Sequence, residues 1–284
     1  MLDWQNLRAD ALYEDEAALV LNKPAGIAVT GERHETDLVR MAADAGETLY
    51  PAHRIDKVTS GAVLFAKTLA HHGDLTRQFN RRTVAKTYLA ITRSTGLPDR
   101  GTIELPLSVG RKNRVRVAAE RAGIVAADDR WTVPADAVFT HVPTYPSTTE
   151  FTTVWTDGTH TLLAVRPITG RRHQIRVHLA WIGYELVGDP LFDRATTAPR
   201  TLLHAWRLGF DAAWLAGSRI VLAATPPGDF WSATGVNNPE TLLRQVETLL
   251  GFGSAVDGAG EGRSGQPVDT LLVEPHDRGA VPPR

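Results

Sequence analysis

Apolar and polar positions along the chain form patterns that predict several strands. The segment 61–68, GAVLFAKT, is apolar at consecutive positions, which is typical of a strand buried on both faces in the middle of a sheet. Three further segments show strand patterns: 83–94, 160–169 and 218–225. The segment 17–30, AALVLNKPAGIAVT, predicts two short strands around a Lys-Pro-Ala-Gly turn, because proline and glycine supply the geometry of such a turn.

Two other segments carry the signals of helices. Residues 69–82 consist mainly of helix-forming side chains. Further along, Asn238 is expected as an N-cap with Pro239 at the first helical position. An apolar stripe follows, and Gly251 is expected to end this helix.

A third helix is expected from about Arg172 to Ile182, in the sequence RRHQIRVHLAWIG. Its apolar residues Ile175, Leu179 and Ile182 share one face, and Gly183 is a stop signal. Strands and helices mix without strict alternation. The expected fold class is therefore α+β, with a large mixed, mainly antiparallel sheet and flanking helices.

The composition of the chain limits its domain organisation. With 284 residues and 43% hydrophobic residues, the chain is long enough to bury a sizeable core. We expect one folded unit over residues 1–252. Residues 253–284 combine frequent glycine and proline with no sustained apolar period, so we expect a mostly mobile tail.

The chain contains no cysteine, which removes disulfides, thiolate catalysis and cysteine metal sites. No run of about 18 apolar residues and no signal peptide pattern is found, so a soluble, cytoplasmic protein is expected. No strong apolar surface pattern remains unassigned, which favours a monomer.

The net charge of −1 argues against a protein that coats nucleic acid without specificity. The basic residues are nevertheless concentrated in three clusters, at 77–86, 111–116 and 171–176. Each cluster alone is more often a solvated face than a nucleic-acid site. Together they allow local positive patches on a neutral protein.

Several motifs resemble the RluA-type family of RNA pseudouridine synthases. The segment 53–68, HRIDKVTSGAVLFAKT, resembles the catalytic stretch of that family, and 169–192, TGRRHQIRVHLAWIGYELVGDPLF, resembles its second long motif. Shorter matches are LNKPAG, AKTYLA and LLHAWRL. The motifs occur in the family's order between about residues 17 and 230, which is roughly three quarters of the chain.

The chain also departs from the family pattern. Lys57 and Val58 stand where Arg and Asp are usual, and Arg172 stands where Thr is common. Residues 116–150 match poorly, and the N-terminal RNA-binding S4 domain of many members is not found. These departures bear on substrate preference more than on chemistry, and RNA capture is expected to come from the catalytic unit itself.

The resemblance implies that the protein converts uridine in structured RNA, ribosomal or transfer RNA, to pseudouridine. Asp56 is then the nucleophile, which attacks the sugar or, as the less favoured option, the uracil ring. Arg176 is its cationic partner, since an adjacent arginine lowers the pKa of an aspartate and orients it. Tyr88 offers an aromatic face and a hydroxyl for acid–base chemistry. The reaction is redox-neutral, and no cofactor or metal is expected.

The same resemblance implies a set of residues that contact the substrate. Ile175 would form the apolar floor beneath the uracil, and Arg54 would fill the gap left in the RNA when the target uridine is flipped out. The remaining substrate-binding candidates are His53, Arg171, His173, Gln174 and Leu179.

Three alternatives remain open on the sequence. A metal site at His173 and His178 is disfavoured, because residues five apart on a helix point away from each other. Glycoside hydrolysis needs a second carboxylate about 5 to 9 Å from the first, and besides Asp56 the motifs offer few carboxylates, of which Asp189 is one. The third alternative is an RNA-binding relative that acts as a folding aid and has lost its catalysis.

Overall fold

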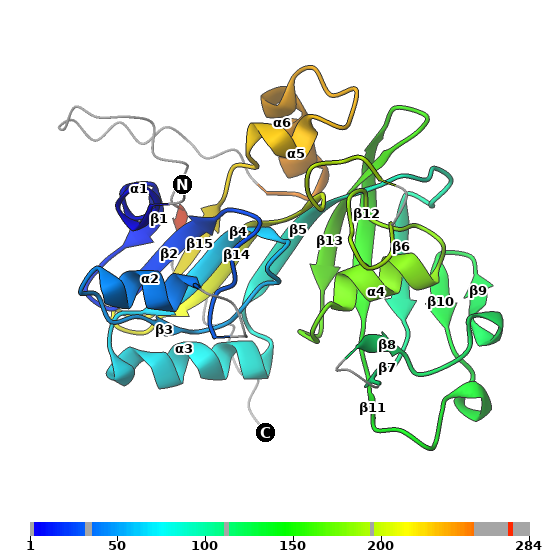
Figure 1. Cartoon of the computed structure of the whole chain (residues 1–284), viewed down its shortest axis with the longest axis horizontal. Helices are drawn as coiled ribbons and strands as arrows, with labels where there is room; N and C mark the ends of the chain where they lie inside the picture. The colour runs from blue at the N-terminus through cyan, green and yellow to red at the C-terminus, as the bar shows by residue number, and fades with distance from the viewer. Residues whose placement is uncertain (1–2, 32–35, 111–113, 194–195, 253–271, 275–284) are drawn as a thin grey trace, which may run out of the picture.

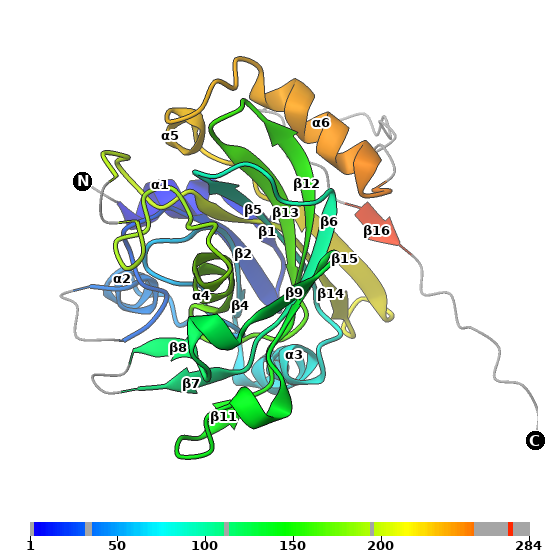
Figure 2. The same cartoon turned by 90° about the vertical axis from the view of Figure 1, so that its right-hand side faces the viewer.

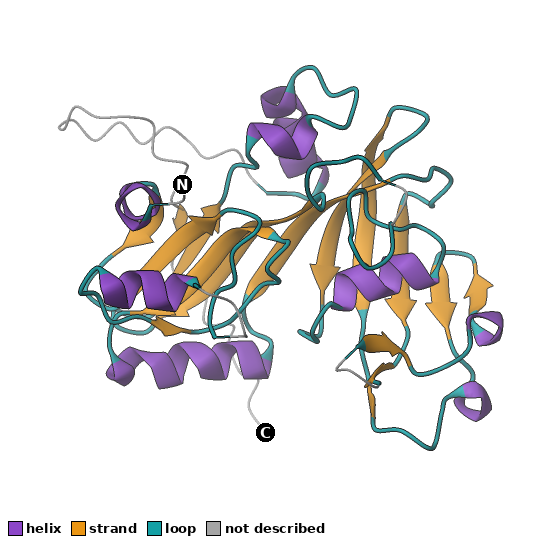
Figure 3. Ribbon diagram, in the orientation of Figure 1, coloured by secondary structure: helices purple, strands orange, loops and turns teal. Residues whose placement is uncertain are grey.

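The computed structural model describes residues 3–31, 36–110, 114–193, 196–252 and 272–274 (Figure 1). Within these residues thirteen strands form one large sheet and three strands form a small one. Figure 3 shows the large sheet crossing the whole molecule, with helices along both of its halves. No helix in these ranges is long and apolar enough to cross a membrane.

The helices are α1 (Trp4–Ala9), α2 (Leu38–Asp44), α3 (Leu69–Arg81), α4 (Gln174–Trp181), α5 (Gly228–Trp231), α6 (Pro239–Leu249) and the 3₁₀ turns η2 (Arg121–Gly123) and η3 (Ala135–Ala137). The first strands are β1 (Ala11–Glu14), β2 (Ala18–Lys23), β3 (Tyr50–Pro51), β4 (Ser60–Ala66), β5 (Ala85–Thr92), β6 (Arg100–Glu104), β7 (Leu107–Val109) and β8 (Val115–Val117). The later strands are β9 (Val125–Ala127), β10 (Arg130–Thr132), β11 (Thr144–Tyr145), β12 (Thr149–Thr156), β13 (Thr161–Pro167), β14 (Leu203–Ala212), β15 (Ser218–Ala223) and β16 (Leu272–Glu274).

The predicted α+β class with a large mixed, mainly antiparallel sheet is confirmed. The sheet runs in the order β1-β2-β4-β14-β5-β13-β12-β6-β10-β9, and β15, β16 and β3 join it off this path. Only β4 with β14 and β6 with β10 pair in parallel among the strands described. The small sheet has the order β11-β7-β8.

Alternation along the central strands divides the core between the two faces of the large sheet. In β4, Val63 and Phe65 pack on the face covered by α2, whereas Leu64 packs on the opposite face with residues of α3. In β5, Leu89 packs toward α5 and α6, and Ala90 packs toward α4. Both faces of these strands are therefore buried, which explains why the segment 61–68 is apolar at consecutive positions.

The strands predicted in segments 61–68, 83–94, 160–169 and 218–225 are confirmed as β4, β5, β13 and β15. The prediction of two strands in segment 17–30 is wrong in its second half. Only β2 forms, and Ala28 makes a single bridge to Asp37. The Lys23 ammonium donates to the carbonyls of Pro24 and Ile27 at 2.8 Å, so these carbonyls are taken by a side chain and not by a neighbouring strand.

The helix predicted from about Arg172 begins two residues later, at Gln174. His173 is the N-cap and has a left-handed backbone with φ of 55°, which prevents the helical turn from starting earlier. The helix is also buried all round instead of on one face only. Figure 2 shows the reason, since α4 packs between strands β12 and β13 of the large sheet and β8 of the small sheet.

The predicted helix at the end of the folded unit is confirmed as α6. The Asn238 side chain accepts a hydrogen bond from the Thr241 N–H at 3.0 Å, and Pro239 is the first helical residue. The predicted tail lies mostly outside the described residues. Within them, the short strand β16 pairs antiparallel with β15.

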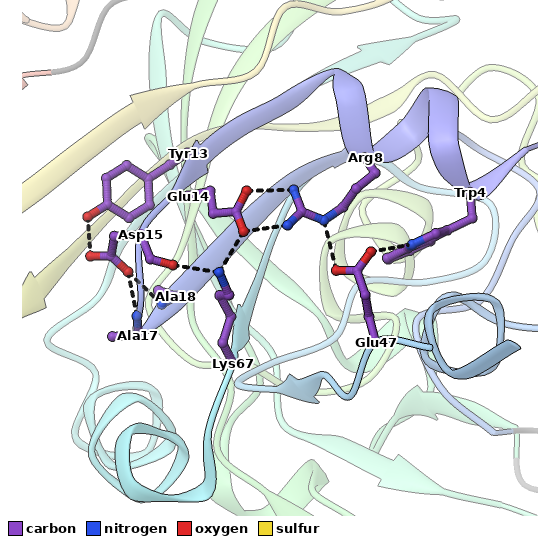
Figure 4. A network of polar contacts seen from close by, with 9 residues as sticks. All are labelled: Trp4, Arg8, Tyr13, Glu14, Asp15, Ala17, Ala18, Glu47 and Lys67. Atoms are coloured by element: carbon purple, nitrogen blue, oxygen red, sulfur yellow. Dashed lines mark hydrogen bonds and ion pairs between the residues drawn. The ribbon is translucent and has the colours of Figure 1, made fainter. Parts of the chain in front are cut away.

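Charged side chains fasten α1 and β1 to the edge of the large sheet (Figure 4). The Arg8 guanidinium pairs with both Glu14 and Glu47, and Lys67 bonds Glu14 at 2.6 Å. The Trp4 indole donates to the same Glu47 at 2.8 Å. These groups are half-exposed, so the network contributes to the placement of α1 more than to the overall free energy of unfolding.

Candidate active site

A cavity of about 600 Å³ opens where four segments far apart in the sequence meet. Its walls come from residues 52–59 before β4, from 76–82 at the end of α3, from Lys86 and Tyr88 of β5, and from residues 167–176 leading into α4. Tyr88 packs against the core clusters of both halves of the sheet. The cavity therefore lies at the junction of these halves.

Asp56 is held at the wall of this cavity by the turn that precedes β4. The preceding residue, Ile55, is buried in the core, and the Thr59 N–H closes the turn on the Asp56 carbonyl at 3.0 Å. The Gly26 N–H and the Lys23 ammonium both donate to the Lys57 carbonyl. The backbone around Asp56 is thus anchored from two sides, and its side chain keeps 22% of its surface exposed.

Arg176 connects Asp56 to a second carboxylate. Its Nη1 donates to Asp56 Oδ2 at 3.0 Å. Its Nε and Nη2 donate to the two oxygens of Asp189 at 2.7 and 2.8 Å. Arg176 and Asp189 are both buried, so this two-point contact fixes the plane of the guanidinium and the direction from which it approaches Asp56.

The charge of Arg176 is maintained by its two partners. Burial alone would lower the pKa of Arg176, but the hydrogen bond with Asp189 and the charges of Asp56 and Asp189 outweigh it and raise that pKa. The guanidinium therefore stays ionised. Asp189 is itself held in place by the Leu191 N–H, which donates to its Oδ1 at 2.9 Å.

His173 faces the other oxygen of Asp56, with Nε2 at 3.6 Å from Oδ1. Burial lowers the pKa of His173, and the nearby charge of Asp56 offsets only part of that effect. The imidazole is therefore neutral near pH 7. One oxygen of Asp56 is bound by a cation and the other faces a neutral ring.

Tyr88 lies on β5 in the same cavity. Burial, together with the negative charge of Asp56, raises the pKa of Tyr88 well above its ordinary value. The phenol therefore stays protonated and acts as a hydrogen-bond donor or an acid. Lys86, two residues earlier on the same face of the strand, also lines the cavity, and burial lowers its pKa.

Several predicted contact residues line the cavity but already have partners in the protein. His53 stacks on Phe79 with ring centroids 4.4 Å apart, and its Nε2 accepts the Leu64 N–H at 3.1 Å. Burial lowers the pKa of His53 to about 3, so the ring is neutral. Gln174 accepts from Thr169 and the Arg171 N–H and donates to Thr148 and Thr149, so its amide braces the loop before α4.

The remaining predicted contact residues divide into two groups. Arg54, Arg171 and Ile175 line the cavity together with His173. Leu179 does not: it is fully buried in the core cluster between α4 and the sheet. The structure thus brings all predicted site residues except Leu179 to one cavity.

Most of the charged residues that line the cavity are cationic. Six cationic residues line it: Arg54, Arg82, Lys86, Arg171, Arg172 and Arg176. Among the described residues of its wall, Asp56 is the single carboxylate. A second carboxylate acid, as glycoside hydrolysis requires, is not found there, because Asp189 is buried behind Arg176.

The two histidines considered as metal ligands lie in different environments. His178 is fully buried, where its Nδ1 lies 2.9 Å from Thr149 Oγ1 and its Nε2 lies 3.0 Å from the Leu105 carbonyl. His173 faces Asp56 in the cavity. No group of three or more candidate metal ligands occurs in the part of the chain that the structure describes.

Sequence reasoning missed two residues that shape the site. Asp189 was considered only as a possible second acid, although its position in the Gly-Asp-Pro end of the long motif could have indicated a partner for Arg176. Lys23 lies in the LNKPAG motif and was given no role. It is fully buried and bonds three backbone carbonyls around the Asp56 turn, which a pattern of residue types cannot reveal.

Comparisons with known proteins show which family this chain resembles. A family model described as RNA pseudouridylate synthase matches residues 17–181. The chain is 33% identical over 215 residues to ribosomal large subunit pseudouridine synthase D of Nitrosomonas europaea, covering 69% of this chain and 56% of that protein. It is 31% identical over 210 residues to the dual-specificity RNA pseudouridine synthase RluA of Pasteurella multocida, covering 71% of this chain and 86% of that one. The chain thus spans just over half the length of the first relative and most of the second.

A solved structure has the same fold. Human RNA pseudouridylate synthase domain containing 4 superposes with a TM-score of 0.63 at 23% identity, over 80% of this chain and 92% of that one. The match of the family model covers more than half of the chain and includes Asp56, Tyr88 and Arg176. The chain belongs to the RNA pseudouridylate synthase family.

Proposed function

We propose that this protein is an RNA pseudouridine synthase that isomerises uridine in ribosomal or transfer RNA, with residues 1–252 as its catalytic unit. One observation carries the proposal: a single carboxylate, Asp56, is oriented by a buried arginine at the wall of a cavity that is otherwise cationic. The relatives named for ribosomal and for dual-specificity RNA modification support this substrate class. Such substrates place the proposed site of action in the cytoplasm.

Asp56 acts as the nucleophile. Its carboxylate attacks C1′ of the ribose, the bond between N1 and C1′ breaks, and the uracil leaves with the electron pair of that bond. The uracil then rotates within the cavity, and C5 forms a bond with C1′ as Asp56 departs. The proton on C5 is finally released to solvent, and N1, which kept the electron pair of the broken bond, takes up a proton in its place. No electron is gained or lost overall, so the residues of this chain need only supply charge, orientation and proton transfer.

Arg176 and Tyr88 complete the chemistry around Asp56. Arg176 places a positive charge beside the nucleophile and aims it, because its other edge is bound to Asp189. Tyr88 is protonated at neutral pH, so it donates a hydrogen bond or a proton to the uracil and is not the base of the resting enzyme. Ile175 supplies the apolar wall on which the detached ring turns.

The cations at the rim capture the RNA backbone around the flipped uridine. Arg171 and Arg172 are exposed at the cavity, and Arg82 and Lys86 also line it, so phosphates around the target meet positive charge. Arg54 is exposed beside Asp56, where it can occupy the space left by the extruded base.

The test uses purified protein and bacterial ribosomal and transfer RNA with tritium at uracil C5. We expect tritium release from one of these pools, and pseudouridine at sites mapped by carbodiimide-dependent primer stops. Asp56→Asn should bind the same RNA and release no tritium. Asp44→Asn, an exposed aspartate on α2, is the matched control and should keep wild-type activity.

Two results would contradict the proposal. Equal tritium release by wild type and Asp56→Asn would remove Asp56 from the chemistry. No release from either pool, with RNA binding retained by both proteins, would favour the alternative of an RNA-binding folding aid.

A further inference from the structure

A second cavity of about 160 Å³ lies next to the catalytic cavity. Arg171 and Arg172 line both cavities, so the two are continuous at this pair of arginines. The other walls of the smaller cavity belong to β7, β8 and β11, the three strands of the small sheet. Nothing in the chemistry at Asp56 uses this cavity.

The walls of the second cavity are apolar side chains on one face of the small sheet. Val109 pairs with Val115, and Leu107 pairs with Tyr145, so these four side chains point to the same side. Leu107 is buried, but Val109 is 48% and Tyr145 is 41% exposed, although both are large apolar or aromatic residues. The Arg171 guanidinium lies over the Tyr145 ring, 5.2 Å from its centroid.

These features match a nucleobase that follows the RNA backbone away from the catalytic cavity. A nucleobase has flat apolar faces and is tied to a phosphate, and proteins bind single strands by combining a cationic track with apolar or aromatic surfaces. Here the cationic track is Arg171 and Arg172, and the apolar surface adjoins it directly. The volume is small beside the catalytic cavity, which suits one planar group and not a helix or a folded segment of a partner protein.

We propose that the second cavity binds the base of a nucleotide adjacent to the target uridine in the same RNA strand. This inference rests on the proposed function, because it requires the target uridine to occupy the catalytic cavity. The second base then holds the strand in register over Arg171 and Arg172. Selection among RNA sites comes in part from the small sheet, whose strand β11 lies in the segment 116–150 that departs from the family pattern.

The kinetic test compares Val109→Asn with Val125→Asn. Val109 and Val125 are both strand valines, 48% and 47% exposed, and only Val109 lines the second cavity. Neither substitution changes the charge. We expect Val109→Asn to lower kcat/KM for tritium release by about tenfold, with kcat at saturating RNA unchanged, because a lost stacking contact weakens binding of substrate and transition state alike. Val125→Asn should behave as wild type.

A binding measurement tests the same contact without catalysis. The full chain, labelled at its valine and leucine methyl groups, is titrated with a pentauridylate and followed by NMR. We expect the methyl resonances of Leu203 in the catalytic cavity and of Val109 and Val115 in the second cavity to shift together. In Val109→Asn the Leu203 shift should require a higher RNA concentration.

The outcomes separate this inference from the proposed function. The second base site would be overturned if the wild type releases tritium and both asparagine variants have the same kcat/KM as the wild type. It would also be overturned if RNA shifts the Leu203 resonances but not those of Val109 and Val115. Either result would leave the proposed function intact. No tritium release and no shift in either cavity would overturn both.

Discussion

At the scale of the residue, the orientation of Asp56 depends on an arginine that serves two carboxylates. Arg176 uses Nη1 for Asp56 and its Nε and Nη2 for Asp189, which only a planar guanidinium can do. A lysine carries the same charge but makes point contacts. Replacing Arg176 by lysine therefore distinguishes the effect of a positive charge near Asp56 from the effect of the guanidinium geometry.

We expect Arg176→Lys to lower kcat for tritium release by about 100-fold, or about 2.7 kcal/mol in activation free energy, with little change in RNA affinity. Single-turnover kinetics and RNA binding measure the two quantities. Arg166→Lys is the control, because Arg166 is an exposed arginine 3.9 Å from Glu150 and should show no effect. A fully active Arg176→Lys enzyme would mean that charge alone is sufficient.

Lys23, which bonds the backbone around Asp56, should give the free energy of unfolding a characteristic dependence on pH. Burial lowers the pKa of Lys23 to about 7, which the charge of Asp56 partly counteracts and that of Arg200 reinforces. In the unfolded chain a lysine has a pKa of about 10.4. Between these two values the unfolded state binds more protons than the folded state, so the Lys23 contribution makes the protein more stable as pH rises.

The expected result is a difference in slope between the wild type and Lys23→Met. From pH 8 to 9.5 the free energy of unfolding of the wild type should rise by up to about 1.4 kcal/mol per pH unit relative to the variant. Urea unfolding of both proteins at several pH values measures this slope. Parallel pH profiles would show that Lys23 keeps its proton in the folded protein over this pH range and that burial does not lower its pKa.

At the scale of the element, the central strands β4 and β14 approach each other unusually closely. Gly61 in β4 has φ of 112°, and a Cβ there would lie 2.3 Å from the Ala205 carbonyl oxygen of β14. This glycine is in the Thr-Ser-Gly that follows Asp56. The contact between two strands about 140 residues apart therefore constrains the residues next to the nucleophile.

Gly61→Ala should destabilise the fold by about 3 kcal/mol or more, because backbone atoms would have to move apart and the φ value disfavours alanine. Gly73→Ala in α3 is the matched control. No atom lies within 4 Å of its added Cβ, and the helix should gain roughly 0.5 to 1 kcal/mol. Urea unfolding of both variants measures these changes in the free energy of unfolding. A Gly61→Ala protein as stable as the wild type would contradict the close approach of β4 and β14.

Some strands and helices could be predicted from the sequence, and others could not. Strands β4, β5, β13 and β15 and the capped helix α6 were predictable, because their signals lie in consecutive residues. The parallel pairing of β14 with β4 was not, since it joins residues far apart and leaves no local pattern. The same holds within the site: Asp56, Tyr88 and Arg176 were found through motifs, whereas the roles of Asp189 and Lys23 depend on contacts that only the folded chain creates.

At the scale of the whole molecule, a net charge of −1 coexists with a strongly cationic cavity. In the sequence, the basic clusters indicate only possible local patches. Folding brings parts of two of them together in the wall of one cavity, to which the first contributes Arg82 and Lys86 and the second contributes Arg171 and Arg172. Attraction to RNA is then a property of one face and not of the whole surface, which favours specific over general binding.

The salt dependence of RNA binding tests this distribution of charge. If Arg82, Lys86, Arg171 and Arg172 each neutralise one phosphate of a single-stranded segment, the slope of log K against log salt should be about −2.8, from four contacts at about −0.7 each. The double variant Arg171→Gln and Arg172→Gln should have a slope of about −1.4, since two contacts are lost. Arg166→Gln removes an exposed arginine outside the cavity and should leave the slope unchanged. An equal change in slope for the double variant and for Arg166→Gln would mean that RNA is held by the overall surface, and the cationic cavity would lose its role in capture.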